Sequence, residues 1–190
     1  MENFNLILTG VGGQGIITLV SILDEACLNQ GYDVKSSELH GLSQRGGSVI
    51  IHVRFGKKVY SPLVSLGRAD LIIGLELVET LKDAYFAGPK TAFLVNEYSM
   101  GYPGYPAKPE ILDSLSKIAK GRLHIIQASE ICKKELDKEV VAGIYLLGYA
   151  VKNNLIPLKK ESFEKALETV IPSKYLDLNL KAFNLAFNHD

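Results

Sequence analysis

Short, continuous apolar runs alternate along this chain with longer segments whose apolar residues recur at helical spacing. Continuous apolar runs are typical of strands that helices cover on both faces, and this alternation predicts an α/β fold with a mostly parallel sheet. We expect one Rossmann-like three-layer domain over residues 1–190, with a helical C-terminal region. The expected strands are residues 5–9, 33–38, 48–55, 71–74, 91–95 and 123–127, and the expected helices are residues 16–29, 77–84, 110–119, 129–136, 140–153, 160–170 and 173–187.

The C-terminal region contains two helices with distinctive apolar patterns. Residues 140–151 are apolar all round, which predicts burial on every side. Residues 173–187 have a single apolar stripe, and we favour docking of that stripe on the chain's own sheet over binding to another subunit. The stripe consists of Leu176, Leu180, Phe183 and Phe187. The tyrosine- and proline-rich loop 96–109 is the longest irregular stretch, and loops of that length are usually functional or contact another molecule.

A glycine-rich turn follows the first expected strand and opens the first expected helix. The turn contains Gly10, Gly12, Gly13, Gln14 and Gly15, and its spacing matches the G-x-G-x-x-G turn of dinucleotide-binding domains. A turn between strand and helix directs unpaired backbone N–H groups at an anion. Glycines also permit tight packing of the helix on the strand. We favour the approach of a ligand or a partner to this turn over packing alone.

A second glycine-rich segment lies directly before the third expected strand and contains Gln44, Arg45, Gly46, Gly47 and Ser48. The guanidinium of Arg45 is a fixed fork of donors suited to a carboxylate or a phosphate. Its glycine neighbours allow a tight turn and close approach to the backbone. A solvated surface arginine is the alternative, and the flanking glycines disfavour it.

Glu38 ends the second expected strand, where a dehydrogenase has the acid that binds the ribose of its cofactor. A salt bridge to Arg45 explains this acid equally well. The sequence shows no helix between the second and third strands, although a βαβαβ nucleotide-binding half requires one. Structural roles are favoured for His40, which has no adjacent nucleophile or carboxylate pair, and for His52, which lies in a strand.

Composition narrows the range of functions. Lys plus Arg and Asp plus Glu both number 21, so the formal net charge is zero and nucleic acid is a poor candidate partner. The two cysteines, Cys27 and Cys132, cannot alone hold a zinc ion or an iron–sulfur cluster, which takes about four ligands. We expect no metal site in this chain. The sequence has neither a signal-peptide pattern nor an apolar run long enough to cross a bilayer, so we expect a cytoplasmic protein without membrane contact.

The two glycine motifs, in this order, resemble the gamma-type catalytic-domain chain of the 2-oxoacid:ferredoxin oxidoreductases. The similarity covers nearly the whole chain, with a loose stretch near residues 98–109. The matching segments are residues 10–15, 38–48, 52–56, 60–63, 69–74 and 171–179. Within the family, the stand-alone subunit of the enzyme that oxidises indolepyruvate is the most similar. The resemblance therefore implies an aryl 2-oxoacid as substrate, with pyruvate, 2-oxoisovalerate or 2-oxoglutarate as alternatives.

The resemblance also implies that this chain is inactive alone. In the family, thiamine diphosphate attacks the 2-oxoacid, carbon dioxide leaves, coenzyme A accepts the acyl group, and electrons pass through iron–sulfur clusters to ferredoxin. This sequence has no Gly-Asp-Gly followed by Asn-Asn to hold thiamine diphosphate, and we identify no catalytic residue in it. The resemblance implies a larger partner subunit with thiamine diphosphate and the clusters. The two glycine motifs would then contribute cofactor-binding groups at the junction, toward coenzyme A or, as the alternative, thiamine diphosphate.

Three other functions compete with this interpretation. A nicotinamide-dependent oxidoreductase is favoured by the first glycine turn together with Glu38. An adenylating enzyme of the ubiquitin-activating type also has such a turn, but it needs a catalytic cysteine and usually a zinc-binding cysteine set, which this sequence lacks. A nucleotide-sensing regulatory module would bind its ligand without any partner subunit.

Overall fold

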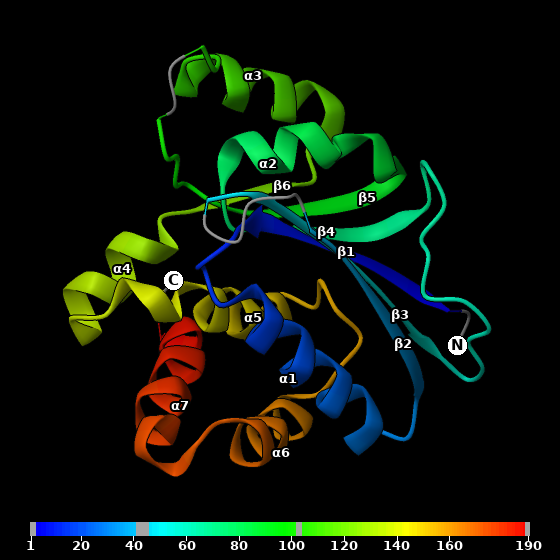
Figure 1. Ribbon diagram of the computed structural model, residues 1–190, viewed down its shortest axis with the longest axis vertical. Helices are drawn as coiled ribbons and strands as arrows, with labels where there is room; N and C mark the ends of the chain where they lie inside the picture. Colours follow the sequence, from blue (N-terminus) through cyan, green and yellow to red (C-terminus); the bar gives the residue numbers. More distant parts are fainter. Residues whose placement is uncertain (1–2, 41–45, 102–103, 189–190) are drawn as a thin grey trace.

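The computed structural model describes residues 3–40, 46–101 and 104–188. Six strands form one sheet in the order β2-β3-β1-β4-β5-β6 (Figure 1). The strands are β1 (Phe4–Val11), β2 (Asp33–His40), β3 (Ser48–Gly56), β4 (Ala69–Gly74), β5 (Ala87–Asn96) and β6 (Leu123–Ile126). Strands β1, β4, β5 and β6 are parallel, whereas β3 is antiparallel to both β1 and β2. The predicted α/β fold with a mostly parallel sheet is confirmed.

The antiparallel strand follows from the short connection between β2 and β3. A parallel neighbour requires a crossover of about a dozen residues or more, usually a helix, whereas a short connection produces a hairpin. The chain has only residues 41–47 between the two strands, so β3 turns back along β2. It then pairs with β1 and separates β2 from β1.

Helices cover the two faces of the sheet unequally (Figure 1). Helices α1, α5, α6 and α7 lie on one face, and α2 and α3 lie on the other, where they contact β1, β4, β5 and β6. Alternate residues of β1 divide accordingly: Leu6 and Leu8 belong to the core with α1, and Ile7 belongs to the core with α2 and α3. The α-helices are α1 (Ile16–Asn29), α2 (Leu77–Lys82), α3 (Lys108–Ala119), α4 (Ala128–Leu136), α5 (Ala142–Lys152), α6 (Lys160–Val170) and α7 (Ser173–Asn188). The two short 3₁₀ helices are η1 (Asp83–Phe86) and η2 (Glu139–Val141).

One of the two distinctive C-terminal helices packs on a different neighbour from the one expected. Helix α5 is largely buried, as its apolar sequence predicts, but Val140 just before it is 61% exposed. The predicted docking of the α7 stripe on the sheet is wrong, because α7 packs mainly on α5. Gly148 of α5 allows the close approach, since a Cβ there would lie 2.2 Å from the Phe183 carbonyl oxygen. Among the described helices, none has the length and apolar character needed to cross a bilayer.

Candidate functional site

The two glycine turns meet at one edge of the sheet. The Gly12 N–H donates to the Gly47 carbonyl oxygen at 2.9 Å, and the Gly46 N–H donates to the Gly12 carbonyl oxygen at 3.3 Å. The turns meet because β1 and β2 end at this edge and β3, which runs the opposite way, begins there. Both glycine turns were expected to emerge at the C-terminal edge of the strands, and this is confirmed for Gly46 and Gly47. Gln44 and Arg45 lie outside the described residues, so their ligand contacts stay a prediction.

Glycine has two different functions within the first turn. Gly13 and Gly15 have φ values of 103° and 73°, a region that favours glycine, and a Cβ at either would meet nothing within 4 Å. Gly10 is instead required by packing, because a Cβ there would lie 2.6 Å from Gln14 Oε1 and 3.1 Å from Leu75 Cβ. The packing interpretation therefore applies to Gly10. Open space beside Gly13 and Gly15 is compatible with an approaching ligand.

Helix α1 begins at this turn without a capping side chain, because its N-cap residue is Gly15. The Leu19 N–H donates to the Gly15 carbonyl oxygen at 3.1 Å. The backbone N–H groups of residues 16–18, in the first turn, therefore have no acceptor within the helix. The first turn contains no acidic residue, and the helix dipole is positive at this end. Backbone donors and dipole together favour an anion at the start of α1.

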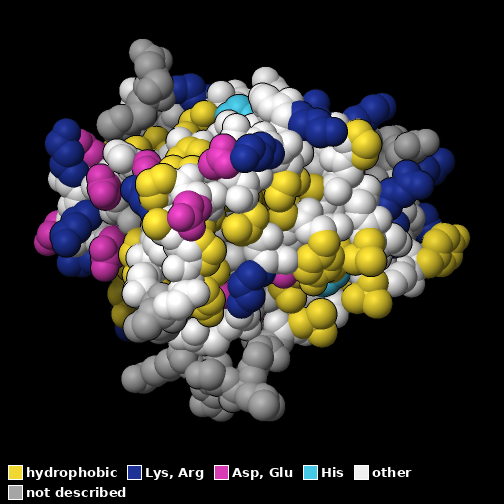
Figure 2. All heavy atoms as spheres, turned by 90° about the horizontal axis from the view of Figure 1, so that it is seen from above, with side chains coloured by type: hydrophobic (Ala, Val, Ile, Leu, Met, Phe, Trp, Pro, Cys, Tyr) yellow, Lys and Arg dark blue, Asp and Glu magenta, His cyan; other side chains and the backbone are white. Residues whose placement is uncertain are grey.

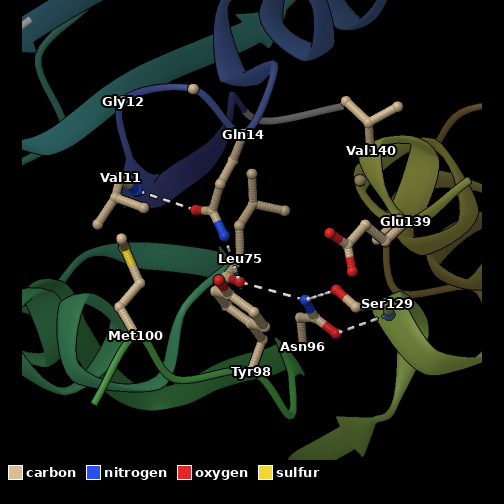
Figure 3. A pocket seen from close by; sticks show the side chains of 13 residues that line it. Val11, Gly12, Gln14, Leu75, Asn96, Tyr98, Met100, Ser129, Glu139 and Val140 are labelled. Atoms are coloured by element: carbon tan, nitrogen blue, oxygen red, sulfur yellow. Dashed lines mark hydrogen bonds between the residues drawn. The ribbon is translucent and has the colours of Figure 1, made fainter. Parts of the chain in front are cut away.

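The Gln14 side chain holds this turn in place. Its Oε1 accepts from the Val11 N–H at 2.9 Å, and its Nε2 donates to the Leu75 carbonyl oxygen at 3.1 Å (Figure 3). These two bonds connect the end of β1 with the residue that follows β4. We expected Gln14 to offer a polar side chain at the helix mouth, and the structure places it in the wall of the site as a brace.

A cavity of about 330 Å³ lies beside Gln14, at the ends of β1, β4 and β5. The chain leaves β1 for α1 on one face of the sheet and leaves β4 for α2 on the other. Such a topological switch point is where open α/β sheets bind ligands. The loop after β5, which we expected to be functional or in contact with another molecule, contributes Tyr98 and Met100 to the lining.

Asn96 is the buried polar centre of this cavity, with only 2% of its surface exposed. Its Nδ2 donates to Ser129 Oγ at 2.8 Å and to the Leu75 carbonyl oxygen at 3.3 Å, and its Oδ1 accepts from the Ser129 N–H at 3.2 Å (Figure 3). Asn96 therefore fixes the first turn of α4 against the end of β5. Sequence reasoning did not single out Asn96, which it placed only as the first residue of the loop 96–109, directly after an expected strand.

Glu139 gives the cavity its charge. It is the only charged side chain among the described lining residues, and Figure 3 shows its carboxylate on the wall opposite Gln14. Because like charges repel, a phosphate is disfavoured at that wall and favoured at the amide-rich turn. The cavity thus has a side that favours anions at the glycine turn and a side that favours hydrogen-bond donors or cations at η2.

Ser48 is tied to α2 by a lysine that the sequence did not point to. Lys82 Nζ donates to Ser48 Oγ at 2.8 Å and to the Glu79 carboxylate at 2.9 and 3.1 Å. Burial lowers the pKa of Lys82, but the hydrogen bond and charge of Glu79 outweigh it, and the net pKa is raised. Ser48, an expected cofactor-binding residue, is therefore held by protein groups at the start of β3.

Glu38 lies away from the first glycine turn. Its side chain is exposed, and its charge contributes to the raised pKa of Asp24, although burial is the main cause. Because β3 separates β2 from β1, Glu38 is two strands from the turn, about 10 Å across the sheet. The strand order disfavours the ribose-binding role, and the predicted salt bridge involves Arg45, outside the described residues.

The remaining histidine and cysteine side chains that the structure describes in the interior have no partner for catalysis. His52 is buried, its Nδ1 accepts from the Val64 N–H at 3.1 Å, and burial lowers its pKa. The His40 side chain is outside the described part of the structure. Cys27 and Cys132 are both free and buried, and burial raises the pKa of Cys132 to about 12. Among the described residues, no group of three His, Cys, Asp or Glu side chains could hold a metal ion.

Comparison with known proteins places this arrangement in a family. The family model for pyruvate ferredoxin/flavodoxin oxidoreductase matches residues 5–189. The chain belongs to this family. It is accordingly a subunit of a 2-oxoacid oxidoreductase, as the resemblance implied.

Two relatives agree with this chain in length as well as in sequence. The chain is 34% identical to an indolepyruvate oxidoreductase subunit IorB from Pyrococcus horikoshii, over 97% of this chain and 95% of the relative. It is 37% identical to the protein of the same name from Archaeoglobus fulgidus, over 97% and 94%. A 2-oxoglutarate:ferredoxin oxidoreductase from Magnetococcus marinus has the same fold, with a TM-score of 0.73 and 19% identity. That superposition covers 100% of this chain and 32% of the solved one.

Proposed function

We propose that this chain is the small subunit of an indolepyruvate:ferredoxin oxidoreductase. Such an enzyme oxidatively decarboxylates an aryl 2-oxoacid to an acyl-CoA and passes the electrons to ferredoxin. The observation that supports this most directly is similarity over 97% of the chain to relatives named as indolepyruvate oxidoreductase subunits. Pyruvate, 2-oxoisovalerate and 2-oxoglutarate are the alternative substrates.

Coenzyme A is the ligand that we assign to the paired glycine turns. The N–H groups at the start of α1 suit a phosphate, because they are uncapped and no acid stands in that turn. Arg45 would add a bidentate donor to the same phosphates. A cavity of about 330 Å³ is at the lower end of the range for ligand sites, so it would enclose only part of a coenzyme. Thiamine diphosphate, which also has a diphosphate, is the alternative ligand.

The partner is a larger subunit that holds thiamine diphosphate and the iron–sulfur clusters. Thiamine diphosphate supplies the electron sink for loss of carbon dioxide, which side chains do not supply. The only two cysteines of this chain are buried thiols on different helices, so they suit no cluster. Asn96, Ser129 and Glu139 in the cavity include no activated nucleophile with its base.

Within the complex, this chain would bind and orient the acyl acceptor. The glycine turns hold the phosphates, while the Gln14 brace and the Asn96 bonds keep the cavity wall fixed. A preformed site avoids the cost of ordering these groups when the ligand binds. The larger subunit would close the open side of the cavity and exclude water from the acyl group before its transfer.

Reconstitution tests this function. Reduction of a viologen dye or ferredoxin is measured with indolepyruvate, thiamine diphosphate and coenzyme A, for the small chain, the larger subunit and the mixture. We expect turnover only in the mixture. Turnover by the small chain alone would contradict the proposed dependence on a partner. Activity of the mixture with pyruvate or 2-oxoglutarate but not with indolepyruvate would keep the family and change the substrate.

A simple binding test separates the nicotinamide and nucleotide-sensing alternatives from the proposed function. Both predict tight binding of NAD(P) or another nucleotide by the isolated chain. The strand order counts against a dinucleotide, because Glu38 is separated from the glycine turn by β3. Micromolar binding of NAD(P) to the isolated chain, measured by calorimetry, would revive the first alternative.

A further inference from the structure

One part of the sheet surface has no helix over it. On the face covered by α2 and α3, these helices lie mainly over β1, β4, β5 and β6. The layer reaches β3 through the Lys82–Ser48 hydrogen bond and through Phe86 of η1, which packs on His52, and among the described residues no α-helix packs on β2 there. Leu39 of β2 pairs with Ile50 of β3, and it is 52% exposed. A three-layer fold normally buries an apolar sheet face under helices. Exposure of Leu39 therefore marks a place where the chain does not complete its own layer.

The loop between β3 and β4 extends this surface with further apolar side chains. Leu63 and Leu66 of this loop are 54% and 69% exposed, and Tyr85 of the neighbouring η1 is 56% exposed. The loop is anchored to the sheet through His52, whose Nδ1 accepts from the Val64 N–H at 3.1 Å. The His52 ring also packs edge-on against the Phe86 ring of η1, with 4.9 Å between the ring centroids. We call the surface formed by Leu39, Ile50, Leu63, Leu66, Tyr85 and Tyr60 the open apolar face.

Two members of the open apolar face, Leu66 and Tyr85, belong to segments that are hydrogen-bonded to each other. The Gly67 N–H, next to Leu66, donates to the Tyr85 carbonyl oxygen at 3.2 Å, and the Tyr85 ring lies 4.5 Å from the Phe86 ring. Figure 2 shows several hydrophobic side chains close together in the lower right of the view, with Lys and Arg side chains above them. Contiguous exposed apolar surface of this kind marks an interaction site, whereas scattered single residues do not.

The chain segment that forms most of this face is basic. Residues 46–68 include Arg54, Lys57, Lys58 and Arg68 and contain no Asp or Glu, although the whole chain has a formal net charge of zero. Two copies of this chain joined through the face would bring these cations together, and like charges across an interface are unfavourable. An occupant with an acidic border around an apolar surface is complementary.

The open apolar face is also continuous with the functional site. Ser48, at the start of β3, lies on the same side of the strand as Ile50 and His52, and Lys82 holds it there. The second glycine turn immediately precedes Ser48. A protein seated on the face would therefore reach the edge where the glycine turns meet, which is where a partner must stand to complete the site.

We propose that the open apolar face is the docking surface for the larger, cofactor-bearing subunit, which meets it with an apolar patch bordered by Asp and Glu. This proposal rests on the proposed function, because it requires that subunit to exist. Tyr60, Tyr85 and Arg54 would be its strongest contacts, since tyrosine and arginine dominate binding energy at protein interfaces. The basic border would steer association and make it sensitive to salt.

The test measures the dissociation constant between the full-length small chain and the larger subunit from the same organism. Leu66→Glu and Tyr85→Glu are expected to raise Kd by about 10-fold or more. Leu28→Glu on α1 and Ile118→Glu on α3 are matched controls, because these side chains are 56% and 40% exposed but lie away from the face. Circular dichroism and Tm verify that each variant is folded. Lys57→Glu with Lys58→Glu is expected to weaken binding more at low salt than at high salt.

The outcomes separate this inference from the proposed function. If the wild-type chain binds and activates the larger subunit while the face variants bind as tightly as the controls, the docking surface is wrong and the function stands. If the wild-type chain neither binds nor activates any such subunit, the proposed function fails and the inference falls with it. If the chain self-associates and Leu66→Glu abolishes that association, the occupant is a second copy and the proposal is overturned.

Discussion

Replacement of Lys82 by Met should loosen the second glycine turn at a measurable cost in stability. The change removes the hydrogen bond to Ser48 and leaves the Glu79 carboxylate, 7% exposed, without its cation. A hydrogen bond to a charged group contributes about 1.5–3 kcal/mol. Because the Lys82 side chain is 46% exposed and therefore screened by water, we expect about 1–2 kcal/mol. For a domain of this size, that loss lowers Tm by about 2–8 °C.

Thermal denaturation followed by circular dichroism measures this effect, with Lys117→Met as the matched control. Lys117 pairs with Asp113 at 2.6 Å, but both side chains are well exposed, so its loss should cost about 0.3–0.5 kcal/mol. A double-mutant cycle with Glu79→Gln then isolates the pair, and we expect a coupling of about 1 kcal/mol. Equal Tm values for Lys82→Met and Lys117→Met, together with no coupling, would refute the anchoring role of Lys82. In the reconstituted enzyme, Lys82→Met should raise KM for coenzyme A more than it lowers kcat.

Three further outcomes follow from the same contacts. Burial lowers the pKa of His52, so the folded chain binds fewer protons than the unfolded chain as the pH falls. Its contribution to stability should be complete above about pH 7 and should be lost as the pH falls from the pKa of the unfolded state toward the lower pKa of the folded state. His52→Asn should flatten this part of a plot of Tm against pH. Gly13→Ala should lower the free energy of unfolding by about 1–2 kcal/mol, because the φ of 103° at Gly13 disfavours a side chain, and it should raise KM for coenzyme A. An unchanged Tm and an unchanged KM would contradict the role of this turn in binding coenzyme A. Arg45→Ala should raise KM for coenzyme A or weaken assembly with little effect on Tm, and unfolding of the isolated variant would instead make Arg45 structural.

The local elements were readable from the sequence because each depends on nearby residues. The strand, glycine turn and helix at the start of the chain were expected at residues 5–9 and 16–29, and they are Phe4–Val11 and Ile16–Asn29. Apolar runs and glycines determine such units directly. The meeting of the two glycine turns was also expected, since both follow strand ends of one sheet.

Relations between distant elements were not readable in the same way. Asn96 contacts Ser129, 33 positions away, and Lys82 contacts Ser48, 34 positions away, and neither pair leaves a periodic signal. The ribose-binding role of Glu38 depended on β2 lying next to β1, but the hairpin inserts β3 between them. The α7 stripe was expected on the sheet because the pattern of one helix cannot reveal that α5 already covers that face.

The most direct test of the central claim is hydrogen–deuterium exchange of the reconstituted enzyme with and without coenzyme A. The claim is that the amide groups of the two glycine turns bind the phosphates of coenzyme A. Slower exchange at residues 10–18 and 46–48 of this chain on addition of coenzyme A is the predicted result. Protection of these residues by thiamine diphosphate alone would assign the turns to that cofactor. Protection by coenzyme A confined to the larger subunit would contradict the claim.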